Sequence, residues 1–233
     1  MKKLSVLLII LLIATIIVGC KAADEGVSGQ KEPATETEGV EEVVEEPAKK
    51  ETLTEGKEVP EKMKVLMIIA SNNFRDEEYD EPRKILEANG AEVIVASSSS
   101  SIAKGMLGMT VKPDILVDDV VVGDYDAIIF VGGSGADEYY TNQKALSIAK
   151  EAVNSGKVLG AICIAPVTLA NAGVLDGKEA TVFSSKAAQL RAKGAIYVNE
   201  DVVQAGKIIT ARGPQAASVF GQTIIDTMKQ NLK

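Results

Sequence analysis

Short apolar runs alternate with segments of helical periodicity along residues 61–233. Four short runs predict strands: 64–70, 92–97, 127–131 and 158–162. The first is a continuous apolar run, as is typical of a buried strand of a parallel sheet. Helices are predicted at 79–89, 144–155 and 215–229, and shorter strands at 180–183 and 207–210. This alternation predicts an α/β domain whose mainly parallel sheet is covered by helices on both faces.

Three candidate site elements come directly after predicted strands. They are the polar stretch after Ala70, the glycines after Val131, and Cys163 after Ile162. Ligands of open parallel sheets bind at the carboxyl ends of the strands. We therefore expect the functional site at this edge of the sheet.

Residues 1–20 have the pattern of a lipoprotein signal peptide. Two lysines precede an apolar run at 4–18 that is short for a membrane span, and the segment ends at Gly19 and Cys20. This ending resembles a lipobox, which implies that Cys20 is lipidated and becomes the mature N-terminus. The alternative is an uncleaved anchor helix. Both interpretations hold the chain at the lipid bilayer of the cell membrane, on its extracytoplasmic face.

Residues 21–60 carry 12 acidic residues and 5 lysines and almost no large apolar side chains. Such a segment cannot bury enough apolar surface to offset the entropy lost on ordering. We interpret it as a disordered acidic linker between the anchor and a domain at 61–233.

The composition narrows the chemistry. The chain has 233 residues, a net charge of −8 and no histidine. The sequence has no stripe of basic residues that would indicate nucleic-acid binding. The missing histidine removes the usual base for a Cys–His pair and the commonest transition-metal ligand, so the sequence gives no signal for a metal or another cofactor. A disulfide between Cys20 and Cys163 is not expected, because each cysteine has a separate explanation.

Cys163 is the strongest candidate for a reactive residue. It lies between a predicted strand and a helix that Pro166 is suited to begin. The positive end of a helix dipole lowers the pKa of a thiol, and the thiolate is the nucleophile. A sharp strand-to-helix turn also exposes a side chain, as in nucleophile elbows. From its position alone, Cys163 is equally compatible with a reactive thiol and with a buried, inert cysteine.

Other groups at this edge are suited to assist the thiol. The backbone N–H of Gly132 or Gly133, with that of Ile164, would form an oxyanion hole; a tight turn with positive φ would need the same glycines. An acid within residues 74–81 would reach the crevice with a pKa raised by burial, and would donate a hydrogen bond to the thiolate. The alternative role of these acids is to complement a helix dipole.

Four segments, in this order, resemble a known family. They are Phe74-Arg-Asp-Glu-Glu-Tyr79, Val131-Gly-Gly-Ser-Gly-Ala136, Gly160-Ala-Ile-Cys-Ile-Ala-Pro166 and Thr210-Ala-Arg-Gly-Pro214. Together they are similar to the ThiJ/PfpI family, whose superfamily includes DJ-1. The resemblance implies a flavodoxin-like three-layer sandwich of the class I glutamine amidotransferase type, assembled as a homodimer or higher homo-oligomer.

The resemblance also implies roles for single residues. Cys163 becomes the nucleophile-elbow cysteine, Glu78 the acid hydrogen-bonded to it, and Gly132-Gly133 the oxyanion contact. Protease-like members carry a histidine directly after the cysteine, where this chain has Ile164. Relatives closer to DJ-1 carry one in the strand after the elbow helix, where Phe183 stands. These departures weaken the expectation of peptidase, deglycase and glyoxalase activity.

Two functions stay open. In the first, the Cys163 thiolate, assisted by Glu78, attacks small electrophiles such as aldehydes or is oxidised by a small oxidant as a stress-protective protein. Hydrolysis would need a base other than histidine, either Glu78 or a lysine or tyrosine. In the second, the domain binds a small ligand without catalysis. A PfpI-like cysteine peptidase is a third candidate, on resemblance alone.

Overall fold

The computed structural model describes residues 62–231. Their main sheet has the strand order β11-β12-β8-β7-β1-β3-β6, and every neighbouring pair is parallel except β11 with β12. Its strands are β1 (Lys64–Ile69), β3 (Glu92–Ser97), β6 (Ile115–Leu116), β7 (Ala127–Phe130), β8 (Val158–Ile162), β11 (Val202–Ala205) and β12 (Ile208–Ala211). The predicted mainly parallel sheet is confirmed.

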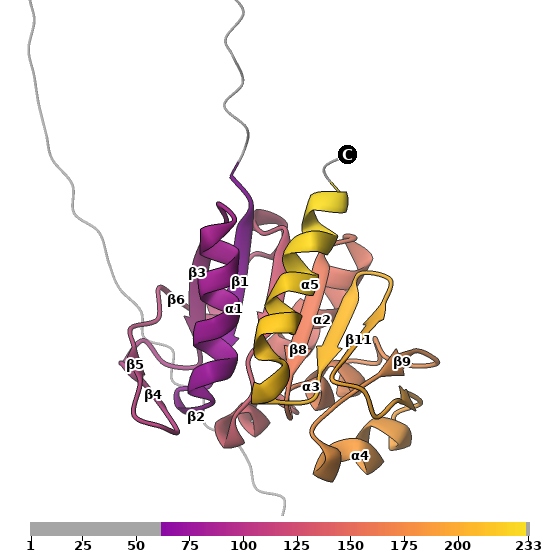
Figure 1. Cartoon of the computed structure of the whole chain (residues 1–233). Coiled ribbons are helices and arrows are strands. Elements are labelled where there is room, and N and C mark those ends of the chain that lie inside the picture. The colour runs from indigo at the N-terminus through magenta and orange to yellow at the C-terminus, as the bar shows by residue number, and fades with distance from the viewer. Residues whose placement is uncertain (1–61, 232–233) are drawn as a thin grey trace, which may run out of the picture. The chain divides into compact units, whose positions relative to one another are not determined.

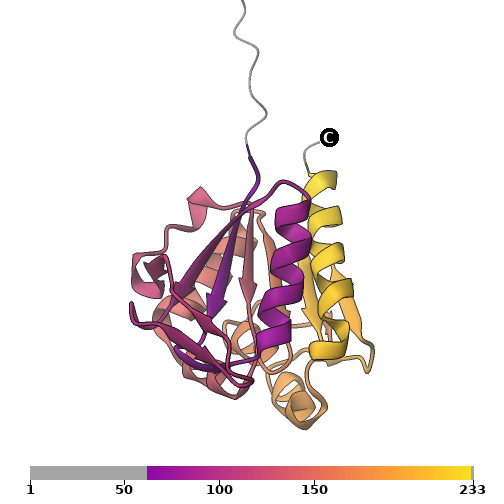
Figure 2. The ribbon, with the colours of Figure 1, turned by 60° about the vertical axis from the view of Figure 1, so that its left-hand side comes forward.

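Helices cover both faces of this sheet, as Figure 1 and the rotated view in Figure 2 show. On one face α1 and α5 lie side by side, and α2 and α3 cover the other. The helices are α1 (Asp76–Ala88), α2 (Gln143–Asn154), α3 (Pro166–Asn171), α4 (Ala187–Ala192) and α5 (Ala217–Gln230). The result is a three-layer sandwich with the sheet in the middle.

The apolar run of β1 explains why both faces need a cover. Successive side chains of a strand point to opposite faces. Val65, Met67 and Ile69 join the core beneath α1 and α5, whereas Leu66 and Ile68 join the core beneath α2 and α3. All five side chains are fully buried. A strand with apolar residues at every position is therefore stable only in the centre of a sandwich.

Smaller elements surround the main sheet. A three-stranded sheet consists of β2 (Asn72–Phe74), β4 (Ala103–Gly105) and β5 (Thr110–Val111), and a two-stranded sheet of β9 (Glu179–Ala180) and β10 (Ile196–Tyr197). Short 3-10 turns lie at Val117–Asp119, Val122–Asp124, Ser134–Tyr139, Ser184–Lys186 and Pro214–Ala216. Several of these short elements provide the walls of the site described below.

Two predicted boundaries differ from the structure by three residues. Helix α1 begins at Asp76, three residues earlier than predicted, because its acidic first turn is helical as well. The predicted strand at 180–183 ends at Ala180. The amide of Phe183 instead donates a hydrogen bond of 2.8 Å to the carbonyl of Cys163, so this segment follows the turn after β8 rather than extending the strand.

The predictions for Cys20, the signal peptide and the linker at 21–60 lie outside the described residues. Within residues 62–231, none of the helices combines the length and apolar character that a membrane span needs.

Candidate functional site

The three predicted site elements meet at one cavity of about 520 Å³ at the carboxyl edge of the sheet. Glu78 comes from α1, Gly133 from the turn after β7, and Cys163 with Ile164 from the turn after β8. The remaining wall combines charged, polar and apolar side chains: Arg75, Met106, Ser134, Asp137, Phe183, Ser185, Lys186, Pro214 and Gln215. The predicted convergence of these elements is therefore observed.

Cys163 stands in a strained turn between β8 and α3. Its φ is 63°, in the left-handed region that non-glycine residues rarely occupy. Its N–H donates to the carbonyl of Ala211 at 2.8 Å, and its carbonyl accepts from the amide of Phe183 at 2.8 Å. Two hydrogen bonds thus hold a conformation that costs about 1–3 kcal/mol. This geometry is that of a nucleophile elbow, and Cys163 lines the cavity.

Glu78 is a fully buried carboxyl group in the first turn of α1. Neither side-chain oxygen has a hydrogen-bond partner of normal geometry, although the Cys163 thiol and the Gly132 N–H lie next to the group. Burial raises the pKa of Glu78 from its ordinary 4.5 to about 8, and the Cys163 thiol, Arg75 and Gly132 lower it only in part. At neutral pH Glu78 is therefore a neutral acid that has a proton to donate.

Gly132 is required by the contact between these two side chains. A Cβ on Gly132 would clash with Oε2 of Glu78 and would lie 2.5 Å from Cβ of Cys163. The next glycine, Gly133, has a φ of 100°, and a Cβ there would clash with the backbone of Arg75 and Asn73. Close approach and positive φ therefore both explain this glycine pair.

The backbone around the sulfur has the donors expected of an anion site. The N–H groups of Gly133 and Ile164 both face the Cys163 thiol and lower its pKa. The structure thus brings together the backbone N–H groups that were predicted to form an oxyanion hole. Of the two candidate glycines, Gly133 faces the thiol, whereas Gly132 lies against the carboxyl group of Glu78.

The predicted lowering of the thiol pKa is wrong for the folded chain. Burial, followed by repulsion from ionised Glu78, raises the pKa of Cys163 to about 12. Helix α3 has only six residues and begins three positions after the thiol, so its dipole does little here. Because Glu78 and Cys163 interact strongly, they lose their protons as a pair. The first proton leaves near pH 8, where Glu78 titrates.

Several residues at the site were not predicted, among them Arg75, Lys186 and Tyr140. Arg75 lines the cavity, and its guanidinium forms two hydrogen bonds with Glu77, of 2.8 and 3.0 Å. Lys186 also lines the cavity, with Nζ 5.6 Å from the ring centroid of Tyr140. Tyr140 donates a hydrogen bond of 3.2 Å to the carbonyl of Ile164. The contacts of Tyr140 with Ile164 and Lys186 join segments far apart in the sequence, so no local motif indicates them.

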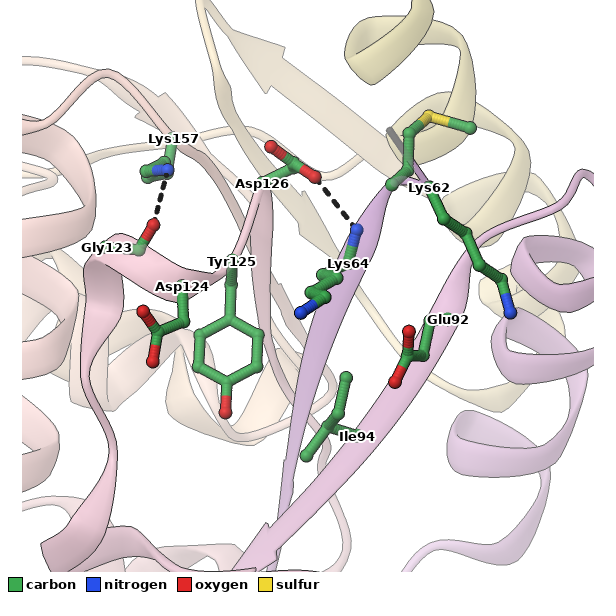
Figure 3. A pocket seen from close by; sticks show the side chains of 10 residues that line it. Lys62, Lys64, Glu92, Ile94, Gly123, Asp124, Tyr125, Asp126 and Lys157 are labelled. Carbon is green, nitrogen blue, oxygen red and sulfur yellow. Dashed lines mark hydrogen bonds between the residues drawn. The ribbon is translucent and has the colours of Figure 1, made fainter. Parts of the chain in front are cut away.

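A second cavity, of about 540 Å³, lies at the opposite, amino ends of the strands (Figure 3). Several of its polar groups are already paired: the amide of Lys64 donates to Asp126 at 2.8 Å, and Lys157 donates to the carbonyl of Gly123 at 3.2 Å. Its wall contains no cysteine and none of the residues predicted for the site. We therefore assign the candidate site to the Cys163 cavity.

Comparison with known proteins agrees with this geometry. The model of the DJ-1/PfpI family matches residues 63–227, nearly all of the described chain. The chain belongs to the DJ-1/PfpI family.

Three similar proteins illustrate the extent of the match. An uncharacterized protein of Methanocaldococcus jannaschii is 43% identical over 171 residues, which cover 72% of this chain and 83% of the relative. A protein named Deglycase PfpI, from Pyrococcus furiosus, is 32% identical over 152 residues, 65% of this chain and 91% of the relative. The crystal structure of a ThiJ/PfpI domain protein from Brachyspira murdochii superposes with a TM-score of 0.71 at 30% identity, covering 72% of this chain and 98% of that one.

Membership of the DJ-1/PfpI family and the observed sheet confirm the flavodoxin-like, class I glutamine amidotransferase-like fold. The chain nevertheless has no histidine. Ile164 and Phe183, which stand where the resemblance places histidines, both line the cavity. The two departures therefore bear directly on the chemistry of the site.

Proposed function

We propose that Cys163 is a reactive thiol that adds to small electrophiles, aldehydes above all, and that is oxidised by peroxides under stress. The observation that carries this proposal is the position of Cys163: a positive-φ cysteine in a strand-end cavity, beside a buried carboxyl group that keeps its proton at neutral pH. Strained residues of this kind are kept at functional sites more often than elsewhere.

The addition step needs only groups of this cavity. The Cys163–Glu78 pair first loses one proton to solvent, and the form that reacts is the thiolate beside protonated Glu78. The thiolate sulfur bonds to the carbonyl carbon, the π electron pair moves to the oxygen, and that oxygen takes up the proton of Glu78, which is left as a carboxylate. The product is a hemithioacetal. With a peroxide, the thiolate attacks one oxygen, the O–O bond breaks, hydroxide leaves, and Cys163 becomes a sulfenic acid. Neither step requires a histidine.

Two observations support aldehydes as the substrate class. The Pyrococcus relative carries the name deglycase. The N–H groups of Gly133 and Ile164 beside the sulfur are suited to stabilise the oxyanion that forms on carbonyl addition. The missing histidine counts against peptide hydrolysis, which needs a base to deliver water or to protonate a leaving amine.

We also propose that the domain is tethered through lipidated Cys20 on the extracytoplasmic face of the membrane, and that it assembles as a homo-oligomer. The tether rests on the charged, apolar and cysteine-terminated pattern of residues 1–20. The assembly rests on membership of a family whose members are commonly homo-oligomeric.

The test is mass spectrometry of the full chain after graded exposure to methylglyoxal and to hydrogen peroxide. We expect the peptide with Cys163 to gain the mass of one methylglyoxal, or of oxygen atoms, faster than the same peptide in the chain unfolded by guanidinium. In Cys163→Ser both additions should disappear. Equal or slower modification of the folded chain would contradict the proposal.

A non-catalytic ligand-binding function is the second candidate. Ile164 and the half-exposed ring of Phe183 favour it. These apolar side chains line the cavity at the positions where the resemblance places histidines, which would transfer protons. If this function is the correct one, small carbonyl compounds should raise the melting temperature of Cys163→Ala as much as that of the wild type.

A further inference from the structure

Lys186 has an unpaired cationic group in the cavity of Cys163. Among the described residues, its Nζ takes part in none of the ion pairs or hydrogen bonds of the structure. The side chain is partly buried, and its Nζ lies over the Tyr140 ring. Because Tyr140 is hydrogen-bonded to the carbonyl of Ile164, this stacking holds the ammonium group near the residue that follows the nucleophile.

Lys186 carries the one cationic group among the residues lining this cavity that is free to bind an anion, because the other charged side chains are paired, protonated or exposed to solvent. Arg75 is held by Glu77 in a two-point ion pair. Glu78 keeps its proton at neutral pH because it is buried. Asp137 is the remaining carboxylate of the wall, and it is exposed to solvent, where water and salt screen its charge. An incoming anion would therefore meet an uncompensated ammonium group in a partly desolvated cavity.

We propose that this cavity selects small electrophiles that carry a carboxylate, and that Lys186 binds the carboxylate while Cys163 attacks the neighbouring carbon. The inference rests on the proposed function, since it names the substrate class of the same thiol. Ser134 and Ser185 offer hydroxyl groups on the same wall for the second carboxylate oxygen. An α-oxo acid of the size of glyoxylate is the kind of molecule that this arrangement fits.

Two alkylating reagents of nearly equal size separate charge from reactivity. In both iodoacetate and iodoacetamide the thiolate forms an S–C bond and iodide leaves, but only iodoacetate carries a carboxylate. The rate constants for alkylation of Cys163 in the full chain are measured by mass spectrometry at low ionic strength. The ratio of the iodoacetate to the iodoacetamide rate constant is then compared with the ratio in the guanidinium-unfolded chain.

We expect a ratio that is higher in the folded wild type than in the unfolded chain. Lys186→Met should lower it about 10-fold, and added salt should lower it in the wild type, because an ammonium–carboxylate attraction of this kind is electrostatic and partly screened. Lys186→Arg should keep the ratio high, because the charge is retained. Asp137→Asn should raise it or leave it unchanged.

An unchanged ratio in Lys186→Met, with a normal iodoacetamide rate, would overturn this inference and leave the proposed function standing. Failure of both reagents to modify Cys163 in the folded wild type would instead overturn the proposed function itself. As a second readout, glyoxylate should protect Cys163 from iodoacetamide at lower concentration than methylglyoxal does, and Lys186→Met should remove this preference.

Discussion

Glu78 has an unusual environment for a carboxyl group, because it is fully buried. A carboxyl group without normal hydrogen-bond partners is costly to bury, and a charged one far more so. The fold accommodates Glu78 by keeping it protonated. A leucine at this position would avoid the cost, so the carboxyl group is best explained by its contact with the Cys163 thiol.

This protonation predicts that stability falls as pH rises. Between the ordinary pKa of 4.5 and the raised value of about 8, the unfolded chain has lost the Glu78 proton and the folded chain still holds it. Stability from this group is complete below the lower value and is lost as pH rises to about 8. The glutamine of Glu78→Gln never ionises, so the variant should lack the effect. The free energy of unfolding of the wild type minus that of the variant should therefore fall by on the order of 4 kcal/mol over this pH range.

Urea unfolding of both proteins at intervals from pH 4.5 to 8.5 measures this difference. A difference that stays constant with pH would contradict the assignment of a neutral Glu78.

At the scale of elements, the apolar runs decided how much of the fold could be predicted. Strands β1, β3, β7 and β8 were predicted within a residue or so, because each carries a run of buried apolar residues that is visible in the sequence. Strands β2, β5 and β6 have two or three residues each and are partly exposed, so they leave no run to detect. Their pairing depends on tertiary contacts.

The residues of the site at strand ends could be predicted, whereas those positioned by tertiary contacts could not. The strand-end rule brings together Cys163, the glycines and an acid within residues 74–81, and the family resemblance selects Glu78 among those acids. Lys186 and Tyr140 belong to segments whose positions depend on how the 3-10 turns fold against the sheet edge. The pKa of Cys163 was predicted in the wrong direction because the sequence indicates a helix terminus but gives no measure of burial.

The close contact of α1 and α5 depends on Gly221. A Cβ at this position would lie 2.8 Å from the Cα of Pro82 and 3.3 Å from Cδ1 of Ile85, and backbone at that distance cannot move away cheaply. We expect Gly221→Ala to destabilise the fold by about 1–3 kcal/mol through overpacking, although alanine favours a helix by about 1 kcal/mol. The midpoint of urea unfolding measures the change.

Gly123→Ala is the matched control, because a Cβ there would meet nothing within 4 Å. It should change stability by less than about 0.5 kcal/mol. The account of helix contact would be wrong if Gly221→Ala were as stable as the wild type.

At the scale of the whole molecule, the chain joins three kinds of segment. Residues 1–20 carry a charge of +2, residues 21–60 a charge of −7, and the remaining residues are only mildly acidic. The proposed tether would display the reactive thiol on an acidic linker outside the membrane. There it would meet electrophiles and oxidants before they enter the cell.

The tether predicts a defined N-terminus. In membranes from cells that express the full chain, we expect the first peptide to begin at Cys20 and to carry a lipid mass. Cys20→Ala should lose that modification and keep residues 1–19. Membrane-bound wild type that retains residues 1–19 with an unmodified Cys20 would favour the anchor-helix alternative and contradict lipidation.

The central claim is that Cys163 and Glu78 act as one titrating pair that yields a reactive thiolate. Its most direct test is the rate constant for alkylation of Cys163 by iodoacetamide as a function of pH, in the wild type and in Glu78→Gln. The reactive form, a thiolate beside a protonated Glu78, is a constant fraction of the singly ionised pair, so the wild-type rate should rise to an inflection near pH 8.

In Glu78→Gln the thiol titrates alone, and burial keeps its pKa above the ordinary 9.0. We therefore predict that the variant shows no inflection near pH 8 and reacts more slowly there, with a rate that still rises about tenfold per pH unit. The same pH profile in both proteins, or a wild-type inflection well below pH 7, would contradict the account.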